Sequence, residues 1–362
     1  MRGPFIIIII ALLALAVFYF SRFIFRFIKL YTKIELSNRW KVIIVCFLIV
    51  SSVPLINMYS IFTNIYMHLL IVSLLYEGIY LLLKKNKIYK FLFTTGILTV
   101  ATVGLIMCYG YYNMNNVVLT KYSITNEKID KLKVLQITDL HMSNSVTVKE
   151  LKKYASDMSK LDADIVVLTG DIFDEQTPLK DMIAACEILG TIKNKSGIYF
   201  VYGNHDGNHY SKKKKFTTED IVNNLTANGI FVLADETMNL NGVSIIGRID
   251  VSSSRYDIKR KEMTELITTA NMDNYIIVLD HQPVELEENA KLGVNLQLSG
   301  HTHGGQYWPS GPLEALLSRR LMYGRRNIGN FTAITSSGIS GWGAPLKTGA
   351  PSEYVLITIT NK

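Results

Sequence analysis

Four long apolar stretches occupy the first third of the chain, and polar residues separate them. They cover Pro4–Phe20, Val42–Phe62, Ile65–Leu83 and Phe91–Tyr112. Each is close to the ~17–25 residues that a helix needs to cross the hydrocarbon core of a bilayer. A helix satisfies its own backbone hydrogen bonds, so it is the structure expected of such a stretch in lipid. The pattern therefore predicts four transmembrane helices within residues 1–112.

The pattern changes after a polar stretch at residues 113–130, which we interpret as a linker. Over residues 131–362, short runs of β-branched residues alternate with segments of helical periodicity. Such alternation is typical of an α/β domain in which helices cover the faces of a sheet. The predicted strands are 134–138, 165–169, 198–202, 243–247, 276–279, 296–298, 331–335 and 354–359, and the predicted helices are 148–160, 179–193, 218–228, 258–270 and 313–318.

The charge of the chain is as uneven as its hydropathy. The 362 residues carry a net charge of +8, yet residues 1–120 hold 11 Lys and Arg against two acids, which leaves 27 basic and 28 acidic residues for the remainder. The basic character therefore belongs to the predicted membrane region, which argues against a nucleic-acid-binding face on the α/β domain. Cys186 is the one cysteine of that domain, so a disulfide-stapled secreted module is excluded.

The basic residues of the membrane region lie mainly in two of its predicted loops. Six lie at residues 21–41 and four at residues 84–90, whereas the connection between the second and third stretches carries none. Basic loops stay in the cytoplasm, so the α/β domain is predicted to face the extracytoplasmic side of the cell membrane. A signal peptide cleaved after Ala16 is the alternative for the first stretch. Because the apolar run continues to Phe20, we expect this stretch to be retained.

Glu77 lies inside the third apolar stretch. A carboxyl group within a membrane span marks a functional site by default, because burying it in lipid is costly. It can equally serve as a hydrogen-bonding partner of a neighbouring helix. The sequence leaves both interpretations open, along with any further role of the transmembrane helices.

Polar side chains gather just after several of the predicted strands, and five of the seven histidines are among them. In α/β sheets, ligands bind beyond the carboxyl ends of the strands, so these side chains are expected to meet. The oxygen and nitrogen ligands in this set are Asp139, His141, Asp171, Asn204, His281, His301 and His303.

Seven such groups exceed the ligand set of one tetrahedral zinc ion and suit two cations of higher coordination number that share a carboxylate. Without thiolates, the set favours manganese, iron, zinc or magnesium. Taken singly, Asp139 or Asp171 could be a helix N-cap, and His301 with His303 could form a surface turn. The whole set together favours a metal centre.

The order of the motifs resembles that of the calcineurin-like metallophosphoesterases. Asp-x-His, Gly-Asp, Gly-Asn-His-Asp, a single His after a strand and Gly-His-Thr-His follow one another along the chain. This resemblance covers Lys131 to Thr360. The Gly304-Gly305-Gln306 extension and the segment from Ser336 to Glu353 further resemble the membrane-anchored branch, the transmembrane proteins with a metallophosphoesterase domain.

The resemblance implies a four-layer α-β-β-α sandwich and a dinuclear metal centre. The implied ligands are Asp139, His141 and His303 for one ion, Asn204, His281 and His301 for the other, and Asp171 between them. His205 would protonate the leaving oxygen or stabilise phosphoryl charge, with Asp206 orienting its ring. Mn²⁺ is the expected metal, with zinc, iron and magnesium as alternatives. Lys347 stands where relatives often carry an arginine, so no substrate preference is transferred.

Two functions from different classes fit these features. The first is a membrane-anchored hydrolase that cleaves phosphoester or diphosphate bonds with a hydroxide bridging two metal ions. Membrane anchoring suggests a lipid-linked or envelope substrate for it. The second is a non-catalytic, membrane-anchored module that binds or senses metal. The intact His205 and Asp206 favour the hydrolase, because a binding module needs no proton donor. The choice among monoester, diester and diphosphate stays open, as does the oligomeric state.

Overall fold

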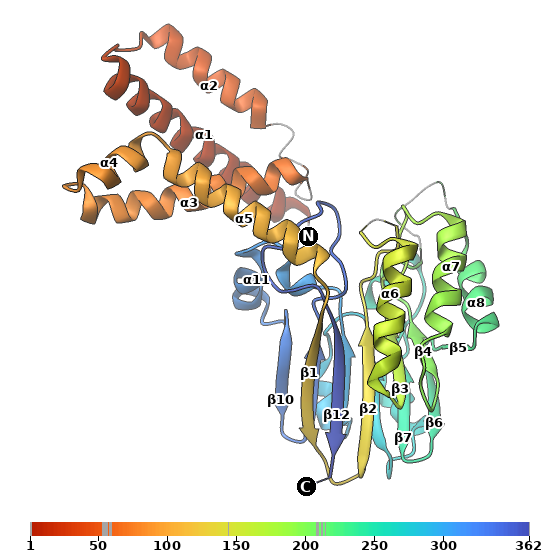
Figure 1. The fold of residues 1–362 in the computed structure, drawn as a ribbon. Helices are drawn as coiled ribbons and strands as arrows, with labels where there is room; N and C mark the ends of the chain where they lie inside the picture. The colour runs from red at the N-terminus through yellow and green to blue at the C-terminus, as the bar shows by residue number, and fades with distance from the viewer. Residues whose placement is uncertain are drawn as a thin grey trace. The chain divides into compact units, whose positions relative to one another are not determined.

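The computed structural model describes residues 2–52, 57, 60–143, 145–207, 210, 213 and 215–361. The chain divides into two compact units, Met1–Gly110 and Tyr111–Lys362. The first unit is helical (Figure 1), and the last of its helices continues into the second unit. The described helices are α1 Arg2–Thr32, α2 Asn38–Ser52, α3 Ile61–Leu83, α4 Lys87–Thr94 and α5 Ile97–Asn115.

Three of the described helices are long and apolar enough to cross a membrane, and they cover Ile10–Thr32, Ile61–Leu83 and Ile97–Asn115. The predicted count of four is therefore not reached in the described part of the chain. Of the predicted span Val42–Phe62, α2 provides a helix that ends at Ser52, and residues 53–56 and 58–59 lie outside the described residues. The predicted fourth span is divided between α4 and α5 at Gly96, whose φ of 78° suits a helix end.

Glu77 of α3 is paired within the helical unit. Its carboxylate lies 3.1 Å from Nη1 of Arg26 in α1 and accepts a hydrogen bond of 3.1 Å from the hydroxyl of Tyr19. The Arg26 guanidinium also lies over the ring of Phe93 in α4, 4.9 Å from its centroid. These contacts agree with the second interpretation of Glu77, in which the carboxyl group binds a neighbouring helix.

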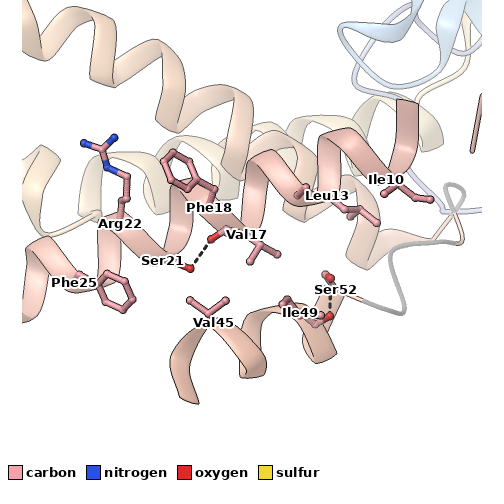
Figure 2. A pocket seen from close by; sticks show the side chains of 11 residues that line it. Ile10, Leu13, Val17, Phe18, Ser21, Arg22, Phe25, Val45, Ile49 and Ser52 are labelled. Carbon is pink, nitrogen blue, oxygen red and sulfur yellow. Dashed lines mark hydrogen bonds between the residues drawn. The ribbon is translucent and has the colours of Figure 1, made fainter. Parts of the chain in front are cut away.

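A groove of about 520 Å³ lies between α1 and α2 (Figure 2). Its lining is almost wholly apolar. The hydroxyls of Ser21 and Ser52 are directed to carbonyl oxygens of their own helices, at 2.6 Å from Val17 and 2.7 Å from Ile49. Because such back-bonding satisfies a hydroxyl within its helix, the groove presents an apolar surface.

The second unit contains two six-stranded sheets (Figure 1), with strand orders β1-β12-β2-β3-β4-β5 and β10-β11-β9-β8-β7-β6. The strands of the first sheet are β1 Val118–Thr125, β2 Lys131–Ile137, β3 Ile165–Thr169, β4 Ile198–Val201, β5 Ile230–Val232 and β12 Glu353–Thr360. Those of the second sheet are β6 Glu236–Leu240, β7 Val243–Gly247, β8 Tyr275–Leu279, β9 Leu296–Ser299, β10 Gly324–Ile328 and β11 Phe331–Thr335.

Strands β2 to β5 run parallel to one another, as do β7, β8, β9 and β11. Parallel strands buried on both faces are expected to be apolar throughout, and β3 and β8 are buried at every position. Along β3, Ile165 and Val167 join a core shared by both sheets, whereas Val166 and Leu168 join the core beneath the helices. The two sheets therefore pack face to face.

Helices cover the outer face of each sheet. The described helices of this unit are α6 Val148–Met158, α7 Leu179–Gly190, α8 Thr218–Ala227, α9 Met263–Leu266, α10 Leu286–Lys291 and α11 Ser310–Ser318. Apolar residues of α6, α7 and α8 belong to the core on the first sheet, and residues of α9 and α10 to the core on the second. This arrangement confirms the predicted four-layer α-β-β-α sandwich.

The polar stretch at residues 113–130 is more than a linker. Its residues Val118–Thr125 form β1, an edge strand that pairs in parallel with β12. Most of its side chains are exposed or only partly buried. The interpretation as a linker was wrong here, because a half-exposed edge strand can carry polar residues that hide it from a hydropathy pattern.

Candidate metal centre

The candidate ligands follow the carboxyl ends of strands from both sheets. Asp139 and Asp171 each stand two residues after β2 and β3, and Asn204 follows β4. His281 and His301 each stand two residues after β8 and β9. Because the two sheets pack face to face, these strand ends bring ligands from both sheets to one place.

The backbone at the candidate ligands is unusual. Values of φ between 44° and 71° occur at Asp139, His141, Asp171, His301 and His303. Side-chain-bearing residues seldom adopt this left-handed conformation. Such strain persists only where the surrounding structure holds it, and it concentrates at functional sites.

The side chains form two clusters, each able to hold a metal ion. The first consists of Asp139, His141 and His303, and the second of Asp171, His281 and His301. Within each cluster, one ligand atom from every residue lies within 4.8 Å of the others. In the first cluster, Nε2 of His303 is 3.6 Å from Oδ1 of Asp139.

Asp171 belongs to the second cluster and also lies next to the first. Its Oδ2 atom is 3.1 Å from Nε2 of His281 in its own cluster and 3.9 Å from Nε2 of His141 in the other. Oδ1 of Asn204 is 3.2 Å from the same nitrogen of His281. The structure thus places all seven predicted ligands together, with Asp171 in the position expected of a shared carboxylate and Asn204 beside the second cluster.

His141 shows that these residues fit a cation. Its ring is fully buried, and neither ring nitrogen has a hydrogen-bond partner of good geometry among the described residues. Buried polar atoms without a partner are rare in folded proteins and need an explanation. A metal ion bound by Nε2, with Asp174 Oδ2 at 3.4 Å from Nδ1, would satisfy both nitrogens.

The pKa values of two of the histidines also fit a bound cation. Burial, aided by the charge of His281, lowers the pKa of His301 to about 4, so its ring is neutral and can bind a metal. Although burial opposes it, the Asp171 carboxylate raises the pKa of His281 well above its usual range. A cation bound by His281 would take the place of the proton that the Asp171 carboxylate stabilises on this ring.

His205 lies beside the clusters and is held by a residue that the sequence analysis missed. Its Nδ1 atom is 3.0 Å from a carboxylate oxygen of Glu175, and its ring centroid is 5.3 Å from that of His141. Burial alone would lower its pKa, but the carboxylates of Asp171 and Glu175 raise it to about 9. These two carboxylates thus favour the protonated form of the ring.

Asp206 has a different role from the predicted one. Its buried carboxylate accepts hydrogen bonds from the backbone N–H groups of Asp171, Phe173 and Gly203, at 2.7, 2.9 and 2.7 Å. It thus ties the loop after β3 to the loop after β4. The described contacts of the His205 ring involve Glu175 instead, so the expectation that Asp206 orients this ring was wrong.

Residues 132–305 match the family model described as calcineurin-like phosphoesterase. All nine predicted site residues fall within that range. Residues 132–305 therefore form a calcineurin-like metallophosphoesterase domain. The resemblance that the order of motifs indicated is thereby confirmed over residues 132–305.

Relatives of the metallophosphoesterase domain occur in bacteria and animals. An uncharacterized metallophosphoesterase of Helicobacter pylori J99 is 26% identical over 238 residues, which are 65% of this chain and 62% of that protein. The metallophosphoesterase YkoQ of Bacillus subtilis is 32% identical over 186 residues, 49% of this chain and 64% of that one. The bovine transmembrane protein with metallophosphoesterase domain is 26% identical over 244 residues, which are 64% of this chain and 53% of that protein. The chain covers less than two thirds of the length of each.

Lys347 is a fully buried lysine close to the candidate metal centre. Its ammonium nitrogen lies within hydrogen-bond distance of four backbone carbonyl oxygens, those of Ser337, Gly338, Ser340 and Pro351, at 2.7, 3.2, 3.3 and 3.0 Å, which share its three N–H groups. Burial lowers its pKa to about 7, although the carboxylates of Asp139 and Glu353 oppose the shift. The same carbonyl of Ser340 lies 3.2 Å from Nδ1 of His303. Lys347 therefore fixes the carbonyl that orients a candidate ligand.

Replacing Lys347 by methionine is expected to weaken metal binding by about 10–100-fold, the range typical of residues that orient a ligand. The change removes the donor that Lys347 supplies to these carbonyl oxygens, so the Ser340 carbonyl no longer holds the ring of His303 in place. Lys347→Arg should restore part of the affinity, because a guanidinium also offers several N–H donors. Metal titration by isothermal calorimetry measures the effect, with the exposed Lys160→Met as control. Unchanged affinity in Lys347→Met would contradict the role assigned to this lysine.

Gly300 shows how closely the backbone approaches the first cluster. A Cβ atom at this position would overlap Oγ1 of Thr138 and Oδ2 of Asp139. Gly300→Ala is therefore expected to push the Asp139 carboxylate out of place and to lower the metal content to about one ion per chain. Elemental analysis measures the number of metal ions per chain. Gly104→Ala, where the added methyl group meets no neighbouring atom, is the control and should retain both ions.

Several functional residues carry no motif that identifies them from the sequence. Asp174 and Glu175 follow Asp171 closely, and this run of acids after a strand was the one available signal. Gln306 is different, because it was already named in the Gly304-Gly305-Gln306 extension; the structure adds that its amide binds the loop at residues 342–346. Lys347 was noticed only as a position where relatives differ, and its burial is a property of the fold.

Proposed function

We propose that this protein is a membrane-anchored phosphohydrolase that uses two divalent ions to cleave phosphoester or diphosphate bonds. The observation that carries the proposal is the pair of ligand clusters with the Asp171 carboxylate next to both. Ions held about 3.5–4 Å apart suit an in-line displacement at phosphorus, because both the attacking and the leaving oxygen can be bound. Mn²⁺ is the first metal to test, and zinc, iron and magnesium are the alternatives.

The two ions would supply a water nucleophile of lowered pKa and would neutralise the phosphoryl oxygens. The protein's own groups set the geometry. His141 and His303 would present ring nitrogens to one ion. The amide oxygen of Asn204 and a ring nitrogen of His281 would bind the other, with the Asp171 carboxylate between them. Asp206 holds the two loops that carry Asp171 and Asn204 at a fixed distance.

His205 is proposed as the proton donor. Because Glu175 lies against Nδ1, that nitrogen carries the hydrogen directed to the carboxylate, and Nε2 is left for the substrate. A proton on Nε2 would pass to the leaving oxygen as the bond to phosphorus breaks. General acid catalysis of this kind requires a donor whose protonation is favoured before the reaction, and the carboxylate neighbours of His205 favour it.

The substrate is proposed to be lipid-linked or part of the cell envelope. The apolar helices support membrane anchoring, and a relative is named as a transmembrane protein. We further propose that the metallophosphoesterase domain lies outside the cytoplasm. The structure places most of the first basic segment, residues 21–41, in α1 and α2 and not in a loop. This segment and residues 84–90 can both face the cytoplasm only if the chain crosses the bilayer twice between them. This orientation therefore requires the Val42–Phe62 stretch to cross as well as α3.

Removal of metal tests the function. The full chain in detergent, stripped with a chelator, is expected to lose hydrolysis of chromogenic phosphate monoesters and diesters and to regain it when Mn²⁺, Zn²⁺, Fe²⁺ or Mg²⁺ is added singly. The ester that is cleaved faster narrows the substrate class. Binding of two ions without turnover of any ester would contradict the hydrolase and favour the metal-binding module.

A further inference from the structure

Helix α11, which follows the Gly-His-Thr-His loop, has an exposed apolar face. Leu313, Leu316 and Leu317 are 52%, 77% and 82% exposed. Residues spaced by three and four lie on one side of a helix, so the three leucines form one surface, the leucine face. Among the helices that lie wholly within Tyr111–Lys362, no other has more than one strongly exposed large apolar residue in the described part. Such a patch marks a contact surface.

Two arginines follow the leucine face directly. The helix ends at Ser318, and the exposed Arg319 and Arg320 come next. Neither guanidinium forms an ion pair with any residue that the structure describes. Glu314 is the single acid of α11. The surface therefore combines apolar side chains with uncompensated positive charge, which fits an anionic lipid surface.

The start of α11 and the end of α5 contact the same loop. In the last turn of α5, Asn113 Nδ2 donates to the carbonyls of Lys347 and Ala350 at 2.8 and 3.1 Å. Just before α11, the backbone N–H of Trp308 donates to Oγ1 of Thr348 at 2.9 Å. A helix apolar enough to cross the membrane therefore ends on the segment that supports α11.

Exposed aromatic residues at the end of α5 are of the kind found at a membrane interface. Tyr111 and Tyr112 are 60% and 63% exposed and lie within the second unit. Tyrosine and tryptophan are enriched at the level of the lipid headgroups. Trp308, also exposed, stands two residues before α11. The leucine face thus belongs to a part of the unit with the composition of a membrane interface.

We propose that the leucine face of α11, with Arg319 and Arg320, rests on the anionic phospholipid surface of the membrane that α5 enters. The leucines insert among the upper acyl chains, and the guanidinium groups bind lipid phosphates. Ser310, the first residue of α11, donates its hydroxyl hydrogen to the carbonyl of Gly305, next to the loop of His303. Membrane contact through α11 would therefore hold the metal-centre loop close to the lipid headgroups.

A tryptophan placed on the leucine face tests the proposal without measuring catalysis. The full chain, with Trp40, Trp308 and Trp342 replaced by phenylalanine, receives Leu317→Trp. It is reconstituted into vesicles of phosphatidylcholine and phosphatidylglycerol whose acyl chains carry bromine. The matched control is Phe231→Trp in the same background, because Phe231 is exposed on β5 at the far edge of the first sheet. Bromine quenches tryptophan fluorescence only at short range, so quenching reports contact with lipid.

Quenching of Leu317→Trp is expected to exceed that of Phe231→Trp by about twofold or more. It should fall when Arg319→Gln and Arg320→Gln are added, and when phosphatidylglycerol is replaced by phosphatidylcholine. Equal quenching at the two positions would overturn the proposal, as would quenching independent of both arginines and anionic lipid. If the background does not fold, a spin label at Leu317→Cys with Cys46→Ser and Cys108→Ser gives the same comparison through its accessibility to oxygen.

Discussion

Replacing Asp171 by asparagine is expected to release one of the two metal ions and to lower kcat/KM by at least about 10²–10³-fold. The Asp171 carboxylate lies between His281 and His141, one from each cluster. Asparagine keeps the shape of the side chain but removes the negative charge. Two divalent cations a few ångströms apart repel each other strongly, and that anion is the group that offsets their repulsion.

Metal content by elemental analysis and kcat/KM on a chromogenic ester measure the effect of Asp171→Asn. The matched control is Asp157→Asn on α6, where the carboxylate is exposed and pairs with Lys160. The control should retain two ions and full activity. If Asp171→Asn also binds two ions and turns over at the rate of the unaltered protein, this carboxylate has no part in the metal centre.

Replacing His205 by alanine is expected to lower kcat by about 10²–10⁴-fold while both metal ions stay bound. His205 is a neighbour of the clusters and not a member of either. Its side chain contacts Glu175, and its backbone N–H donates to Oδ1 of Asp171 at 2.8 Å, a bond that the substitution keeps. The change therefore removes the proton donor and leaves the ligands in place.

The leaving group distinguishes a proton donor from a group that only stabilises charge. An ester of 4-nitrophenol needs little protonation of its leaving oxygen, whereas an alkyl ester needs much. The loss in His205→Ala should therefore be smaller for the nitrophenyl ester. Glu175→Gln should show the same pattern at a smaller amplitude, because it removes the carboxylate that positions the ring. Equal losses for both esters would contradict the role of His205 as general acid.

The sequence predicts the core of the fold well because buried parallel strands leave a strong signal. The strands at 165–169 and 331–335 coincide with β3 and β11, which are buried along their whole length. Edge strands leave a weaker signal in the sequence. β1 exposes or half-exposes most of its residues and pairs with β12, more than two hundred residues away along the chain. Local patterns do not show such a pairing, so the segment was interpreted as a linker.

The candidate site likewise contains residues that the sequence indicates and residues that only the structure shows. The candidate ligands could be chosen from the sequence because each stands near a strand end and belongs to a motif of recognisable residue types. The groups that support them were not, because their roles depend on the course of the loops. Asp206 follows His205 directly, yet its carboxylate points to the backbone of two loops. Glu175 reaches His205 from another loop, thirty residues earlier.

The most direct test of a two-metal phosphoesterase counts bound metal and turnover in the same sample. The metal-free chain is titrated with Mn²⁺, and bound metal per chain and ester hydrolysis are measured at each step. The expected result is two ions per chain, with activity that reaches its maximum only as the second ion binds. Full activity with one ion per chain, or binding of two ions with no hydrolysis of any phosphoester, would contradict the proposed mechanism.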